Sequence, residues 1–272
     1  MTFAGLILAL MQIWFGKFHM ASTPANAQQL PLFYSSLVPL SSQTHGSHGL
    51  AQRSDLGFTK GTHAIPVTVD EFPVVQRHYP IVFGMGENPA PLALVGLQEG
   101  ENLYVNAENQ WEANHYIPAF VRRHPFMLAR LSPQGEELSL CFDEASGLVN
   151  ADASEKLFDG ADPTDLTKNV LAFCEQFEQA VFRTRAFMDE LTKLDLLMDG
   201  EVTINRDGLD QPAVYRGFRM VSEEKLQALR GDQARKLVQS GMLGLVYAHL
   251  FSLSLISPLF ERQYAATTAK AA

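Results

Sequence analysis

A chain of 272 residues with 46% hydrophobic and 19% charged side chains has an ordinary globular composition and is long enough to bury a large core. Its net charge of -9 argues against the extended basic surface that binds a phosphate backbone, so we expect no nucleic-acid partner. Cys141 and Cys174 are too few and too far apart for a disulfide framework or a zinc pair. Both are expected to be buried small hydrophobic side chains, although a single disulfide between them stays open.

The N-terminal stretch bears on the compartment. Residues 3–15 are almost wholly apolar, and Ala25-Asn26-Ala27 has the small-x-small form of a signal-peptidase site. No positively charged side chain precedes Phe3, however, so translation from Met20 is the alternative. A signal predicts a periplasmic or surface location, with membrane contact only if residues 3–16 are retained; a start at Met20 predicts a cytoplasmic one. Residues 1–54 are expected to form a largely disordered extension, rich in polar residues and glycine.

Several short strands are predicted over residues 62–143, which makes this half of the chain rich in β-structure. A helical turn from Glu71 should end at Tyr79-Pro80, since the residue before proline avoids helical backbone angles. The apolar run Ile81-Val82-Phe83 then forms a strand. Residues 93–105 alternate well enough for two strands around a turn at Gln98–Glu101. Further strands are expected at residues 115–121, 125–129 and 136–143.

The second half is predicted to be mainly helical. Asp162 is expected to cap a long helix with Pro163 in its first position, and apolar residues then recur every three or four positions from Leu166 to Leu194. A hairpin follows at residues 201–220, and then short helices capped by Ser222 and Asp232. Residues 241–260 carry no charged side chain and could span a membrane by length. Because the segment contains a histidine and a proline, a buried terminal helix is expected instead.

These elements predict one α+β domain over residues 55–264, with a disordered tail at 265–272. The sequence contains no GxGxxG, phosphate-binding loop, GxSxG or HExxH motif, which removes the commonest nucleotide-binding, hydrolase and zinc-protease classes.

The remaining candidate site residues are scattered. His78, His115 and His124 lie near carboxylates in the first half, and two histidines with one carboxylate would suit a non-haem iron centre. Arg122 and Arg123 are candidates for holding a carboxylate or phosphate, because a guanidinium binds such groups through two parallel hydrogen bonds. Glu99 and Glu101 flank a turn and are further ligand-binding candidates. The aromatic residues nearby (Trp111, Tyr79, Tyr104 and Tyr116) are expected mostly in the core.

A family resemblance rests on several of these stretches. Tyr79–Phe83, followed by Leu94–Leu97 and Glu99–Tyr104, resembles the bacterial SapC family. Trp111, Tyr116-Ile117-Pro118 and Arg123–Phe126 extend the likeness, which covers roughly residues 55–262. The family has no established site residues, so none is carried over to this chain.

The resemblance implies a non-enzymatic accessory or binding protein of the bacterial cell envelope, associated with a surface layer or with nutrient uptake. Many relatives are encoded beside TonB-dependent receptors, so envelope or uptake proteins are the expected partners. Other neighbours are cupin-like and halogenase-like proteins. They suggest the alternative of a metal-dependent enzyme of the non-haem iron type, using His78, His115 or His124. A purely structural layer protein is a third possibility. The cofactor is left open.

Overall fold

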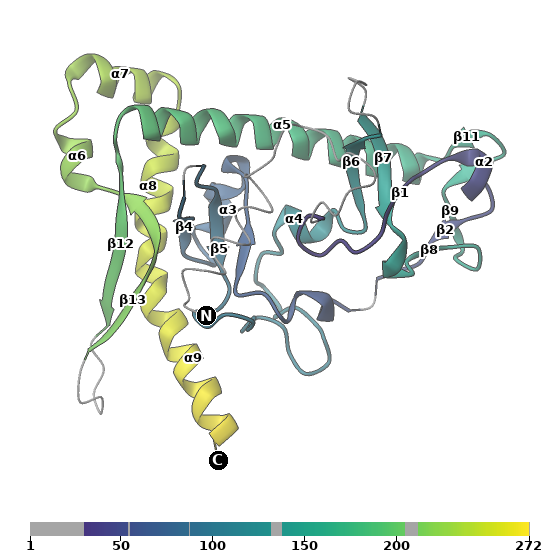
Figure 1. Ribbon diagram of the computed structural model, residues 1–272, viewed down its shortest axis with the longest axis horizontal. Helices are drawn as coiled ribbons and strands as arrows, with labels where there is room; N and C mark the ends of the chain where they lie inside the picture. Colours follow the sequence, from purple (N-terminus) through teal and green to yellow (C-terminus); the bar gives the residue numbers. More distant parts are fainter. Residues whose placement is uncertain (1–29, 54, 87, 132–137, 205–211, 272) are drawn as a thin grey trace.

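The computed structural model describes residues 30–53, 55–86, 88–131, 138–204 and 212–271, with side chains as far as Thr268. The fold is a mixed α+β arrangement, as predicted, and most of the strands in the described residues precede residue 164. Two groups of strands lie under one long helix, α5 (Asp165–Lys193), which runs along the long axis of the molecule (Figure 1). The predicted signal or anchor segment lies outside the described residues.

The first group is a five-stranded antiparallel sheet in the order β12-β13-β4-β5-β3. β13, from the hairpin predicted in the second half of the chain, pairs with β4, the strand predicted after Tyr79-Pro80, and Arg219 lies opposite Phe83. Segments far apart in sequence therefore share one sheet. Its strands are β3 (Ala64–Pro66), β4 (Ile81–Phe83), β5 (Pro91–Leu94), β12 (Leu197–Ile204) and β13 (Ala213–Val221).

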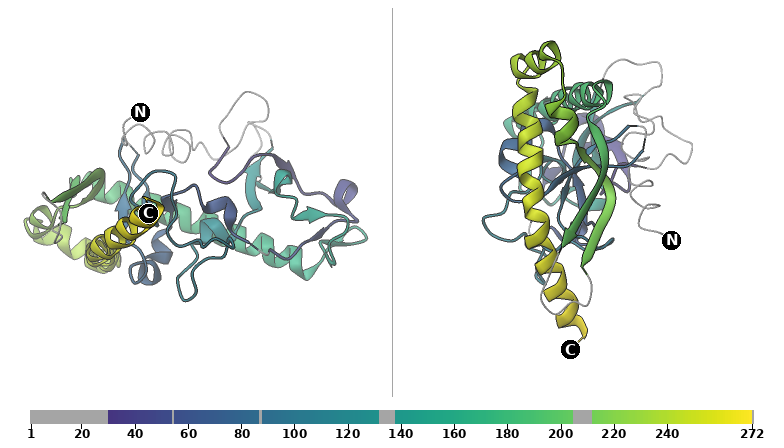
Figure 2. Two further views of the ribbon diagram at one scale, coloured as in Figure 1. Left: turned by 90° about the horizontal axis from the view of Figure 1, so that it is seen from below. Right: turned by 90° about the vertical axis from the view of Figure 1, so that its left-hand side faces the viewer.

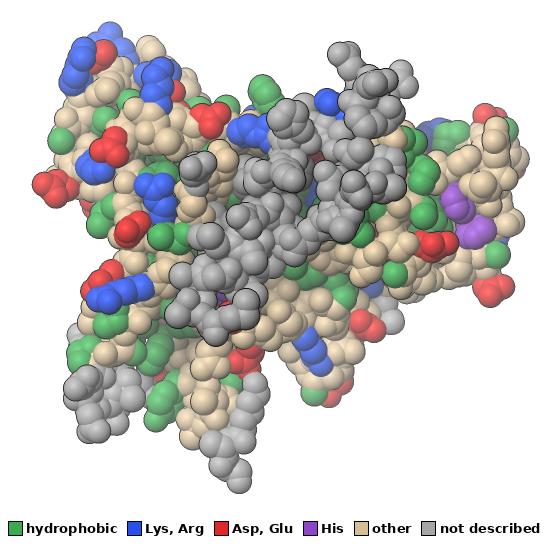
Figure 3. Space-filling view, in the orientation of Figure 1, with side chains coloured by type: hydrophobic (Ala, Val, Ile, Leu, Met, Phe, Trp, Pro, Cys, Tyr) green, Lys and Arg blue, Asp and Glu red, His purple; other side chains and the backbone are tan. Residues whose placement is uncertain are grey.

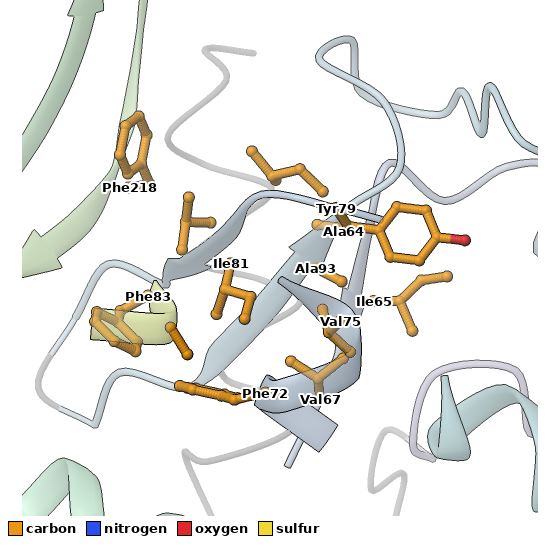
Figure 4. Close-up of a cluster of buried hydrophobic side chains, with 14 of the residues drawn as sticks. Ala64, Ile65, Val67, Phe72, Val75, Tyr79, Ile81, Phe83, Ala93 and Phe218 are labelled. Carbon is orange, nitrogen blue, oxygen red and sulfur yellow. The ribbon is translucent and has the colours of Figure 1, made fainter. Parts of the chain in front are cut away.

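The main core lies against this sheet. The short helix η2 (Val69–Glu71) buries Val69, and the fully buried Phe72 and Val75 of α3 (Phe72–Val75) lie beside the side chains of β4 and β5 (Figure 4). Phe72, Tyr79 and Phe83 are each 0% exposed, and burying one such aromatic side chain stabilises the fold by about 1.5–3 kcal/mol. The stretch that carries the family resemblance is thus also the centre of the core.

The second group is built from two three-stranded sheets, β1-β7-β6 and β8-β2-β9, with the small ribbon β10-β11. Residues 37–50, expected in the disordered extension, supply β1 and β2, which pair with β7 and with β8 and β9. The fold therefore begins earlier than residue 55. The elements are β1 (Leu37–Pro39), α2 (Ser42–His45), β2 (Gly49–Leu50), η1 (Gly57–Thr59), β6 (Phe126–Arg130), β7 (Leu138–Asp143), η3 (Glu144–Ser146), β8 (Val149–Asn150), β9 (Glu155–Lys156), β10 (Phe158–Asp159) and β11 (Asp162–Pro163).

The long helix α5 joins the two groups, because it contacts η2 on one side and β6 and β11 on the other. Its predicted apolar face is buried, with Phe177, Phe187 and Leu191 at most 4% exposed. The predicted cap was wrong by two residues. Thr164 is the N-cap and its side chain accepts the amide of Thr167, while Asp162 belongs to β11 and pairs with Asp159.

Two predicted strands are wrong, and at the first of them a tertiary hydrogen bond holds a helical conformation instead. Residues 119–122 form the short helix α4 (Ala119–Arg122), whose first amide donates to the buried carboxylate of Glu71. After the turn at residue 98, only an isolated bridge between Val105 and Trp111 replaces the second strand of the predicted pair.

The C-terminal segments are helical, as predicted. Ser222 caps α6 (Glu223–Gln227), but Arg230 rather than Asp232 is the N-cap of α7 (Gly231–Gln239). α8 (Met242–Ser252) is joined to α9 (Ile256–Ala271) by the 3-10 turn η4 (Leu253–Leu255) (Figures 1 and 2). α8 packs on α3, β4 and β13. α9 occupies residues expected in the tail.

The stretch Met242–Thr268 is long and apolar enough to cross a membrane by length and composition alone, and 33% of its most apolar window is buried within the fold. The prediction of a buried terminal helix therefore holds for one face only. That face carries Val246, His249, Ser252 and Ile256, whereas Tyr247 and Phe251 are 42% and 67% exposed.

Candidate functional site

A cavity of about 800 Å³ opens between α4, the first turns of α5 and the second group of strands. Its walls come from residues 50–53, 55, 56 and 109–111, from α4 and the following turn, and from the first third of α5. Most lining side chains are apolar, among them Leu56, Trp111, Ile117 and Phe173, but Arg53, Arg122, Arg123 and His124 are included. A mainly apolar cavity with a few convergent polar groups is the usual form of a small-molecule site.

Arg123 is a buried cation in the wall of this cavity, with 4% of its surface exposed. Its guanidinium carbon lies 4.3 Å from the ring centre of Phe177 and 4.5 Å from that of Phe120. Its Nη1 lies 3.5 Å from Oε1 of Glu178, a long ion pair, and its Nε has no hydrogen-bond partner. Since burying a cation without full pairing is costly, this charge is only partly compensated by the protein.

Arg122 lies at the more exposed side of the cavity and is held in a fixed orientation. Its Nε donates to the carbonyl oxygen of Ile117 at 3.0 Å, and its Nη2 donates to the hydroxyl of Tyr116 at 2.9 Å. The guanidinium also lies over the rings of Tyr116 and Phe173. Among the described residues, Nη1 makes no hydrogen bond, so it is the donor that a ligand can use.

His124 lies at the centre of a polar chain that holds Arg53. Nη2 of Arg53 donates to Nδ1 of His124 at 2.8 Å and also to the carbonyl oxygen of His124. Because Nδ1 accepts, Nε2 carries the proton and donates to Oδ2 of Asp143 at 3.2 Å. The other oxygen of Asp143 accepts the amides of Ser35 and Ser36. Burial, followed by the charge of Arg53, lowers the pKa of His124, so the imidazole is neutral.

This arrangement does not suit acid–base or nucleophilic catalysis. Both ring nitrogens of His124 are engaged within the protein, so the ring positions Arg53 and is not free to accept a proton from a substrate. Cys174 also lines the cavity, but burial raises the pKa of its thiol to about 12, and a thiol that stays protonated is a poor nucleophile. Both cysteines are buried and free, as predicted, and form no disulfide.

The other histidine candidates lie elsewhere. The rings of His78 and His115 lie 5.7 Å apart, beside Tyr104, and neither residue lines the cavity. Glu112 is 3.9 Å from His115, but it pairs with Arg262. Across the described residues, no group of three or more His, Cys, Asp or Glu side chains is placed to hold a metal ion. The structure thus brings two of the three histidines together and places His124 with Asp143.

The acidic candidates also lie outside the cavity lining. Glu99 is exposed at its turn. The carboxylate of Glu101 accepts from the side-chain amide of Gln263, whose Oε1 in turn accepts the backbone amide of Leu97. Glu101 therefore ties α9 to the loop after β5, which is a structural role.

Sequence reasoning missed Arg53 because it lies within the expected extension. No local pattern marks it, since its partner His124 is 71 residues away in sequence. The basic run at residues 122–124 was the available signal, and its three residues all line the cavity.

Comparison with models of protein families identifies a family for this chain. The model of the SapC family matches residues 40–259, most of the chain. Comparison with curated proteins gave no match, and neither did comparison with solved structures.

Proposed function

Since the chain belongs to the SapC family, we propose that it is a non-enzymatic binding protein that takes a small molecule into the cavity around Arg122 and Arg123. The observation that supports this most strongly is the state of the polar groups in the cavity wall. Both ring nitrogens of His124 are hydrogen-bonded within the protein, and the thiol of Cys174 stays protonated. The guanidinium groups of Arg122 and Arg123, in contrast, keep N–H donors that have no partner among the described residues. Groups of this kind suit recognition better than bond cleavage.

We further propose that this binding serves the bacterial cell envelope, in association with a surface layer or with nutrient uptake. This proposal is supported by the gene neighbourhoods that the family resemblance implies, in which relatives are encoded beside TonB-dependent receptors. Envelope or TonB-dependent uptake proteins are the proposed partners. The chain would associate with them in order to receive or deliver the bound molecule.

Native mass spectrometry of the protein purified from bacterial cells tests the binding role. Val170, on α5, lines the cavity and is half-buried, so Val170→Trp should fill it. Leu171→Trp adds the same bulk one residue further on, at a side chain that is 36% exposed and outside the lining. We expect a small-molecule adduct on the native chain and on Leu171→Trp, and none on Val170→Trp. Equal adducts on all three, with unchanged thermal unfolding, would show that the cavity is not the binding site.

Metal analysis separates this proposal from the enzyme alternative. The protein should be purified without a histidine tag, and its iron and zinc content measured together with that of His78→Ala and His115→Ala. Stoichiometric metal that both substitutions remove would support the non-haem iron enzyme and contradict the binding role.

A further inference from the structure

Two of the three cavity arginines, Arg53 and Arg122, lack a carboxylate partner among the described residues, whereas Arg123 pairs with Glu178. Elsewhere, Arg183, Arg216 and Arg262 each pair with an acidic side chain, and Figure 3 shows the visible Lys and Arg side chains interspersed with Asp and Glu. Within the described part of the chain, neither Arg53 nor Arg122 forms an ion pair with a carboxylate. Their hydrogen bonds go to a neutral ring, to carbonyl oxygens and to a phenol.

The charge of the cavity wall indicates how many negative charges a ligand should carry. Three arginines line it, and two carboxylates, Asp55 and Glu155, lie in the same wall. His124 is neutral, so the residues of the lining carry one net positive charge, while Glu178, the partner of Arg123, lies outside the lining. A singly charged anion is neutralised by such a wall, whereas a phosphate dianion would exceed it.

The shape and polarity of the remaining surface indicate the rest of the ligand. Leu56, Trp111, Ile117 and Phe173 form much of the wall away from the arginines. Phe173 also lies under the guanidinium of Arg122, 5.3 Å from it, so an apolar surface begins directly beside the free donor. A ligand that fits both features has a carboxylate at one end and an apolar body at the other.

We propose that the cavity binds a monocarboxylate with an aromatic or aliphatic body, its carboxylate held by Arg122 and Arg53 near the buried charge of Arg123. This inference rests on the proposed binding function and assigns its ligand class. The free Nη1 of Arg122 supplies one charge-assisted hydrogen bond. Arg53 supplies others from Nε and Nη1, which make none to the described residues.

Phenylacetate, phenylacetamide and phenyl phosphate are probes of similar shape that differ in charge. The chain has two tryptophans, Trp14 and Trp111, so Trp14→Phe leaves the cavity residue Trp111 as the fluorescent reporter. Titration calorimetry provides a second reading. We expect phenylacetate to bind at least about tenfold more tightly than phenylacetamide, because a charge-assisted hydrogen bond has no counterpart with the amide. We also expect phenylacetate to bind more tightly than phenyl phosphate.

Arg122→Gln should weaken phenylacetate binding by about tenfold and leave phenylacetamide binding nearly unchanged. Arg122 is exposed, so this variant should remain folded. Arg216→Gln is the matched control, because it removes the same charge from an exposed pair on β13. Its affinity for phenylacetate should equal that of the parent chain.

The possible results separate this inference from the proposed function. Equal affinity for phenylacetate and phenylacetamide, or tighter binding of phenyl phosphate, would overturn the monocarboxylate assignment while the binding function stands. Binding of phenylacetate that Arg122→Gln leaves intact would also overturn it. Failure of all three probes to bind, together with no adduct on the native chain in mass spectrometry, would overturn both.

Discussion

His249 on α8 joins two strands of the main sheet that are distant in sequence. Its Nε2 accepts the backbone amide of Val221 at 3.1 Å, and its Nδ1 lies 2.8 Å from the carbonyl oxygen of Ile81. Because Nε2 accepts, the proton lies on Nδ1, which donates to Ile81. The side chain is 0% exposed, so the imidazole must stay neutral to keep both bonds.

This burial predicts that acid destabilises the fold. Burial lowers the pKa of His249 from 6.5 to about 4. In the unfolded chain the histidine binds a proton below pH 6.5, whereas the folded chain does not until about pH 4, so the unfolded state is favoured as pH falls between these values. The stability contribution is complete above pH 6.5, and a loss of about 3 kcal/mol is expected by pH 4.

Urea unfolding at several pH values measures this loss. His63 is buried with a pKa lowered to about 4 by the same cause, so it should add to the effect. His249→Gln keeps hydrogen-bonding groups but does not titrate. It should flatten the pH dependence between 6.5 and 4 relative to the parent chain. An unchanged slope would show that His249 is not the titrating group.

A second prediction concerns Glu71, whose buried carboxylate accepts four hydrogen bonds. They come from the amide and hydroxyl of Thr68, the amide of Ala119 and the hydroxyl of Tyr116. Glu71→Ala leaves these donors without their acceptor, so the free energy of unfolding should fall by about 3 kcal/mol or more, measured in urea.

The neighbouring Asp70 is the control for this change. It pairs with Arg183 at the surface, where both side chains are substantially exposed, and such pairs contribute little. Asp70→Ala should therefore cost less than about 1 kcal/mol. Similar losses for both variants would contradict the role assigned to Glu71.

Local sequence patterns predicted the elements that local forces determine. The long apolar periodicity gave α5, and the Tyr79-Pro80 pair gave the start of β4. Elements that depend on partners far away in the sequence were not predicted. Helix α4 is held by a bond from Ala119 to Glu71, 48 residues away, and Arg53 is positioned by His124, 71 residues away. No local pattern encodes such bonds, so the cavity could not be assembled from the sequence alone.

The two cysteines give a third prediction. Burial raises the pKa of Cys141 to about 11 and that of Cys174 to about 12, and both side chains are at most 2% exposed. Neither thiol should react with a disulfide reagent such as Ellman's reagent in the native protein at pH 8, while both should react in denaturant. Rapid reaction of one thiol in the native state would show that the region around it opens readily.

Two glycines give opposite expectations for the same substitution. A methyl group on Gly200 in β12 would lie 2.1 Å from the ring of Phe218, a side chain that is 2% exposed. Gly200→Ala should therefore force a shift in the core and cost about 1–3 kcal/mol. Gly244 in α8 has no atom within 4 Å of the added methyl group, and alanine favours a helix over glycine. Gly244→Ala should be neutral or stabilise by up to about 1 kcal/mol, as read from urea unfolding. If Gly244→Ala instead lowered the free energy of unfolding more than Gly200→Ala, the exposed face of α8 would have to be covered in solution, so that the added methyl group met the covering surface.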